Sequence, residues 1–119
     1  MAKNTEKEKD TLEKKEYYGN LLTIYGKLLS KTILDRMTSC YLDDLSITEI
    51  AQNEKVSRNA VFQSLTYGKA SLDEYENHMG LMKRDSRCLE IIKKIEKADN
   101  QEKRNELLER LKGEFNNGI

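Results

Sequence analysis

The sequence predicts an all-α protein, a compact bundle of about five helices followed by one or two further helices toward the C-terminus. The 119 residues contain no proline, and 35% of them are charged, in long stretches rich in lysine, glutamate, leucine and isoleucine. Apolar residues recur at spacings of three and four, as a helix with one buried face requires. Alternating β-branched runs between turn residues, the pattern of strands, are missing.

Chain length and charge pattern divide the sequence into three parts. A chain of this length supports one domain with a modest core and is too short for two ordinary domains. Residues 1–15 are predicted to form a charged N-terminal tail, solvated or continuing the first helix as a frayed extension. Residues 16–82 form the main helical domain, and residues 83–119 form a C-terminal helical extension.

The first helix is expected over residues 16–28. Its buried stripe consists of Leu21, Leu22, Tyr25, Leu28 and Leu29. Ser30 is placed to cap a second helix, because its hydroxyl can accept a hydrogen bond from a first-turn N–H that has no carbonyl partner. The inner face of that helix consists of Ile33, Leu34, Met37 and Tyr41.

Three further helices are expected before residue 83. Ser46 and Glu49 have the spacing of a capping box and open a short third helix over residues 47–53, which ends in a turn at Glu54 and Lys55. Ser57 opens a fourth helix with an inner face of Ala60, Val61 and Leu65, and Gly68 is expected to end it. A second capping box, Ser71 with Glu74, predicts a fifth helix with a stripe of Leu72, Tyr75, Met79 and Met82.

The C-terminal extension carries two apolar stripes separated by residues 98–100, which look like a break. The first stripe is Cys88, Ile91, Ile92 and Ile95, and the second is Leu107, Leu108, Leu111 and Phe115. Two antiparallel helices or one long bent helix both fit this pattern. Because a small chain has little to cover the second stripe, we expect a homodimer formed through these helices or through the first one.

Residues 47–65 have the spacing of a helix-turn-helix. Ala51 supplies the small residue where the two helices cross, Val56 the inward apolar residue after the turn, and Val61 with Leu65 the inner face of the second helix. Lys55 stands where glycine is common, at a cost of roughly 1 kcal/mol if its backbone is left-handed. The residues expected to contact a nucleic acid or a partner are Ser57, Arg58, Asn59, Phe62, Gln63 and Thr66.

The charge distribution does not favour tight binding to duplex DNA. The whole chain has 21 basic and 21 acidic residues, and residues 42–82 hold three basic and seven acidic ones, a net charge of −4. A DNA-binding protein usually neutralises several phosphates with lysine and arginine side chains, and this segment has too few of them to do so. A secondary basic patch is predicted from Lys83, Arg84, Arg87, Lys93, Lys94 and Lys97, with an ordinary salt-bridged helix face as the alternative interpretation.

No constellation of catalytic or metal-binding residues is present in the sequence. His78 is the single histidine, no glycine-rich phosphate loop occurs, and Cys40 and Cys88 lack metal-ligand spacing. We therefore expect neither an enzyme, a cofactor nor a metal. Two free thiols, the charged N-terminus and the absence of a long apolar run predict a cytoplasmic protein without membrane insertion.

The segments YLDDLSITEIA at 41–51, VSRNAV at 56–61 and LDEYENHMGL at 72–81 resemble the YlxM family of bacterial proteins. The helix-turn-helix itself also resembles region four of bacterial sigma factors. The YlxM resemblance implies an all-helical regulator, dimeric in some members, associated with the signal recognition particle pathway. Relatives tend to carry basic residues where this chain reads SLTYGK, and often have glutamine and tyrosine in place of Asn59 and Phe62.

These observations lead to one functional expectation and one alternative. We expect a non-enzymatic regulator of the signal recognition particle pathway that contacts the RNA or the proteins of the particle. The alternative is a transcriptional regulator that binds duplex DNA.

Overall fold

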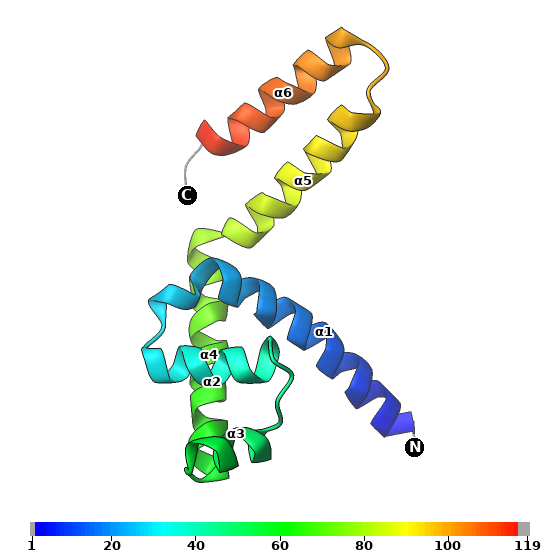
Figure 1. The fold of residues 1–119 in the computed structure, drawn as a ribbon. Helices are drawn as coiled ribbons and strands as arrows, with labels where there is room; N and C mark the ends of the chain where they lie inside the picture. The colour runs from blue at the N-terminus through cyan, green and yellow to red at the C-terminus, as the bar shows by residue number, and fades with distance from the viewer. Residues whose placement is uncertain (1, 117–119) are drawn as a thin grey trace. The chain divides into compact units, whose positions relative to one another are not determined.

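The computed structural model describes residues 2–116, with side chains from Leu12 onward, and all of its regular structure is helical. The α-helices are α1 (Ala2–Tyr25), α2 (Lys31–Tyr41), α3 (Ile47–Glu54), α4 (Arg58–Met79), α5 (Leu81–Lys97) and α6 (Gln101–Asn116), and the 3-10 helix η1 (Gly26–Leu28) follows α1 (Figure 1). No strand occurs between residues 2 and 116, so the all-α prediction is confirmed. The helices form two compact units that divide between Asn77 and His78.

The core of the first unit gathers residues from α1, α2, α3 and α4. It consists of Leu21, Leu22, Tyr25, Leu29, Met37, Ile50, Ala51, Val61, Leu65 and Leu72. Most of these lie on the predicted inner faces. Leu28 was wrongly assigned to the core and is exposed, because α1 ends at Tyr25 and the tighter 3-10 turn rotates the following side chains away from the α-helical stripe.

Three predicted helix starts are confirmed by their caps. The Ser30 hydroxyl accepts from the N–H of Ile33, and the Ser57 hydroxyl accepts from the N–H of Ala60 at 3.0 Å. At α3 both halves of the capping box are present, since Glu49 N–H donates to the Ser46 hydroxyl and Ser46 N–H donates to the Glu49 carboxylate.

The predicted break between a fourth and a fifth helix is wrong, because α4 runs without interruption from Arg58 to Met79. Gly68 is buried in the middle of this helix, where α2 crosses it. A Cβ on Gly68 would lie 2.7 Å from the Met37 sulfur and 3.1 Å from Ile33 Cγ2. The glycine therefore permits a close helix crossing and does not end the helix, and Ser71 lies in the helix interior, where it opens no helix.

The second unit is a hairpin of α5 and α6, with the predicted break at residues 98–100 between them (Figure 1). In the part of this unit that is described, up to Asn116, the buried residues are Cys88 and Ile91 of α5. Ile92 is more exposed than the predicted stripe required. Of the two arrangements left open for this segment, the structure shows the antiparallel pair.

Candidate nucleic-acid interface

The turn between α3 and α4 gives the first unit the geometry of a helix-turn-helix. Lys55 adopts the left-handed conformation, with φ 58° and ψ 44°, as expected for a residue in the usual glycine position. The Val56 N–H donates to the Ala51 carbonyl at 3.0 Å and so closes the end of α3. The Val56 side chain is 37% exposed, so the prediction that it points into the core is wrong.

Arg36 of α2 fixes the relative positions of the two helices of the motif. Its Nε lies 3.1 and 3.2 Å from the two carboxylate oxygens of Glu54, at the end of α3, and one terminal nitrogen donates to the Ser64 hydroxyl of α4 at 2.9 Å. One guanidinium thus links three helices. Sequence reasoning missed Arg36, because nothing in the local pattern distinguishes it from other charged residues of a helix surface.

The predicted contact residues of α4 share its outer face. Arg58, Asn59, Phe62, Gln63 and Thr66 are all exposed, and Phe62 keeps 55% of its surface accessible. The Thr66 hydroxyl donates to the Phe62 carbonyl at 2.9 Å, while the Ser57 hydroxyl is occupied by its capping bond. The structure therefore leaves the side chains of Arg58, Asn59, Phe62 and Gln63 accessible to a ligand.

The acidic residues of the motif region are largely engaged by other parts of the first unit. Asp44 forms an ion pair with Lys15 and Glu54 with Arg36, while Glu49 is held in its capping box. By contrast, no ion pair joins Lys55, Arg58 or Lys69 to a carboxylate of the described side chains. The net charge of −4 therefore leaves out Lys15 and Arg36, two cations outside residues 42–82 that pair with acids inside this segment.

Two tyrosines of α1 bind carboxylates of α4. The Tyr18 hydroxyl donates to Asp73 at 2.9 Å, and the Tyr25 hydroxyl donates to Glu76 at 2.8 Å. Glu76 is only 5% exposed, so this carboxylate belongs to the interior of the first unit. Burial and the hydrogen bond to Asp73 raise the pKa of Tyr18, and burial raises the pKa of the neighbouring Tyr41 to about 12.

The six residues of the secondary basic patch all lie on α5, where they have different surroundings. Arg87 forms a two-pronged ion pair with Glu114 at 3.0 to 3.1 Å, and this bond lowers the pKa of the Glu114 carboxyl. The guanidinium of Arg84 lies 5.5 Å from the centre of the Phe115 ring. Both arginines thus hold the hairpin together, whereas Lys93, Lys94 and Lys97 are exposed.

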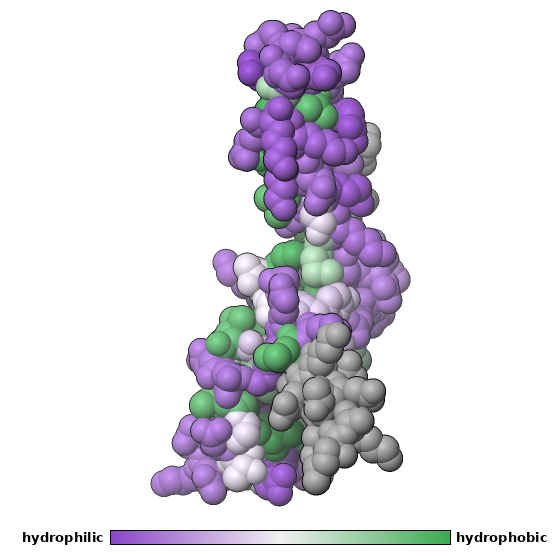
Figure 2. Space-filling view, turned by 90° about the vertical axis from the view of Figure 1, so that its right-hand side faces the viewer, coloured by the Kyte–Doolittle hydropathy of each residue, from purple (hydrophilic) through white to green (hydrophobic). Residues whose placement is uncertain are grey.

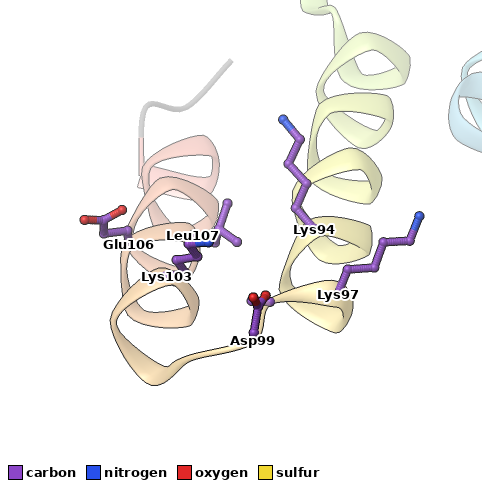
Figure 3. Close-up of a pocket in the computed structure, with 7 residues that line it drawn as sticks. Lys94, Lys97, Asp99, Lys103, Glu106 and Leu107 are labelled. Atoms are coloured by element: carbon purple, nitrogen blue, oxygen red, sulfur yellow. The ribbon is translucent and has the colours of Figure 1, made fainter.

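A shallow pocket of about 350 Å³ lies near the tip of the hairpin. It is lined by Lys94, Lys97, Ala98, Asp99, Lys103, Glu106 and Leu107. Figure 3 shows the Lys97 side chain directed away from α6, and the lining ammonium groups do not converge on one point. The pocket mixes lysines with two carboxylates, so its lining defines no single ligand.

The described residues contain no cluster of three or more potential metal ligands. Among the helices described, none is long and apolar enough to cross a membrane.

Comparison with known proteins agrees with the helix-turn-helix geometry. The profile of the UPF0122 family, described as "Putative helix-turn-helix protein, YlxM / p13 like", matches residues 12–113. A UPF0122 protein of Malacoplasma penetrans is 37% identical over 75 residues, 63% of this chain and 70% of the relative. One of Geobacillus kaustophilus is 36% identical over 84 residues, 71% of this chain and 76% of the relative. The predicted resemblance is confirmed, and the chain belongs to the UPF0122 family of YlxM/p13-like helix-turn-helix proteins.

Proposed function

We propose that this chain is a non-enzymatic regulatory protein of the signal recognition particle pathway, which contacts the RNA or the proteins of that particle in the cytoplasm. The main observation in support is the outer face of α4, where the predicted contact residues are exposed on a helix braced from behind by α2 and α3. Family membership supports a helix-turn-helix regulator, and the YlxM resemblance supplies the pathway.

Binding of duplex DNA is the second candidate function. The exposed Arg58 has the two N–H donors for a bidentate contact with guanine. The amide of Asn59 or Gln63 can donate to N7 of adenine and accept from its N6 amino group. Lys55, Arg58 and Lys69, which form no ion pair with a carboxylate among the described side chains, are fewer cations than a specific DNA-binding protein usually places on phosphates. We therefore rank duplex DNA behind RNA or protein.

A homodimer is part of the proposal. On α6, Leu108 is 40% exposed and Phe115 is 58% exposed, and none of its residues is buried within one chain. Figure 2 shows that hydrophobic residues reach the surface at several places on an otherwise mostly hydrophilic face. A second copy would remove such apolar area from water.

Direct binding measurements at two salt concentrations test this proposal. Purified protein is titrated with signal recognition particle RNA and with random duplex DNA at about 50 and 200 mM salt, a range over which phosphate-driven affinity falls steeply. Salt-sensitive binding to the RNA is the expected result. Preference for the duplex would favour transcriptional regulation, and no binding to either would leave a protein-docking scaffold.

Two variants assign the surface in the same assay. Arg58→Ala is expected to weaken a contact made by α4. The pair Lys93→Ala with Lys94→Ala is expected to weaken an RNA contact of the hairpin and to flatten its salt dependence. Unchanged binding in both would contradict the two surfaces proposed.

A further inference from the structure

We propose that one edge of α4 binds an unpaired nucleotide of RNA, with its base stacked on Phe62 and the adjoining phosphates contacting Arg58 and Lys69. This inference rests on the proposed function and names the structural state of the ligand, a single strand or loop in place of a duplex. It follows from the placement of an exposed aromatic ring between two cations that pair with no carboxylate of residues 12–116.

The three residues lie along one line of the helix surface. At about 100° per residue, Phe62 is rotated about 40° from Arg58 and Lys69 about 20°, so all three fall within a narrow sector of α4. Along the axis, Phe62 is about 6 Å from Arg58 and Lys69 about 10 Å beyond Phe62. The order along this edge is therefore cation, aromatic ring, cation.

The Phe62 ring contributes little to the core of the chain. Phe62 is 55% exposed, while Leu65 and Val61, about 60° and 100° around the helix from it, are buried. An accessible aromatic face offers any base a stacking partner, and unpaired RNA bases, unlike bases inside a duplex, are free to use it.

Charge favours a nucleic acid on this edge. Neither Arg58 nor Lys69 is ion-paired with a described carboxylate, whereas Glu54 is bound by Arg36 and Asp73 accepts a hydrogen bond from Tyr18. The cations remain available for phosphates, and the neighbouring acids are turned toward α2 and α1.

The surroundings of Phe62 fit a nucleotide better than a protein. Its exposed neighbours on the outer face, Asn59, Gln63 and Thr66, are polar and uncharged. A protein interface needs a contiguous apolar centre, and the other large exposed apolar residue of the α4 outer face, Tyr67, lies about 140° around the helix from Phe62. One ring flanked by hydrogen-bonding side chains is the arrangement that a single base requires.

A tryptophan reporter gives the sharpest test. The chain contains no tryptophan, so Phe62→Trp introduces a single indole at the proposed stacking position. Titration with a single-stranded RNA of about ten nucleotides, within the range of known single-strand sites, is expected to quench its fluorescence. The matched control is Tyr67→Trp, at a position 63% exposed on the same helix, where no quenching is expected.

Affinity measurements complete the test. Phe62→Leu keeps an apolar side chain but removes the flat ring, and it is expected to weaken single-strand binding about ten-fold. Arg58→Gln and Lys69→Gln are each expected to reduce the salt slope by about one. Circular dichroism establishes that every variant keeps its helical content, which these exposed or half-exposed positions permit.

The outcomes separate this inference from the proposed function. If wild-type protein binds particle RNA but Phe62→Leu binds it equally well, or both tryptophan reporters are quenched alike, the stacking site is overturned and the proposed RNA contact stands. Equal affinity for duplex and single strand would also overturn it. If no RNA is bound at all, both the stacking site and the RNA branch of the proposed function fail.

Discussion

Gly68 shows how one residue determines the packing of two helices. A methyl group at this position would lie 2.7 Å from the sulfur and 2.8 Å from Cγ of Met37, closer than packed atoms approach. Alanine is favoured over glycine by about 1 kcal/mol in a helix interior, but overpacking typically costs about 1 to 3 kcal/mol. We expect Gly68→Ala to lower the free energy of unfolding by about 1 kcal/mol, as measured by urea denaturation.

Gly113 of α6 provides the matched control. It is also helical, and a Cβ placed on it meets no atom within 4 Å, so Gly113→Ala brings only the gain in helix propensity. Its substitution is expected to stabilise α6 by up to about 1 kcal/mol. If both substitutions stabilised the protein, the close contact between α2 and α4 would not be as the structure describes it.

Of the two tyrosine hydrogen bonds between α1 and α4, the more deeply buried one should contribute more to the free energy of unfolding. Tyr25 is 2% exposed and donates to the buried Glu76, whereas the bond from Tyr18 to Asp73 is partly accessible to water. We expect Tyr25→Phe to cost about 2 kcal/mol of unfolding free energy and Tyr18→Phe about 1 kcal/mol or less. Denaturation of both variants checks the order, and a larger loss for Tyr18→Phe would contradict it.

At the scale of the element, the capping serines separate true helix starts from coincidental ones. Ser46 and Ser71 are both followed three residues later by glutamate, yet Ser46 opens α3 while Ser71 lies inside α4. Ser46→Ala is expected to cost about 1 kcal/mol through loss of the cap. Ser71→Ala is expected to cause little loss or a slight gain, because alanine favours a helix interior. Equal losses in urea denaturation would contradict this assignment.

Predictions from sequence succeeded where a helix is determined by neighbouring residues. The caps at Ser30, Ser46 and Ser57 need only a hydroxyl and a backbone N–H two or three residues away, and all three form. The same local reasoning misread Gly68, whose role depends on Met37, 31 positions earlier in the chain. Local pattern carries no information about which helix will cross at that point.

The candidate site was predictable in its residues more than in its electrostatics. Helical spacing from Ser57 was sufficient to place Arg58, Asn59, Phe62 and Gln63 on one exposed face. The charge count treated every acid as equally exposed, although Glu76 is buried and Glu54 is bound by Arg36. Such pairing joins residues that are distant in the chain, so counting the charges of one segment does not reveal it.

At the scale of the whole molecule, the two units have unequal cores. Among the residues whose side chains are described, the first unit buries ten apolar ones and the hairpin buries Cys88 and Ile91, while none of the residues of α6 is buried. Helices with few buried contacts open by local fluctuation long before the core does. The hairpin is therefore stabilised largely by surface interactions such as the ion pair between Arg87 and Glu114, which contribute little in water.

Hydrogen exchange measured over a range of protein concentrations tests both this inequality and the proposed homodimer. In dilute protein, amides of α6 are expected to exchange fastest among the helices from α2 onward and those of central α4 slowest. If a second copy covers Leu108 and Phe115, protection of α6 should rise with protein concentration, because the second copy binds only the folded hairpin and so stabilises it. Phe115→Ser is expected to abolish that rise, whereas Leu12→Ser, at an exposed position of α1, should preserve it. Protection of α6 that stays constant over the whole concentration range would contradict a dimer formed through the hairpin.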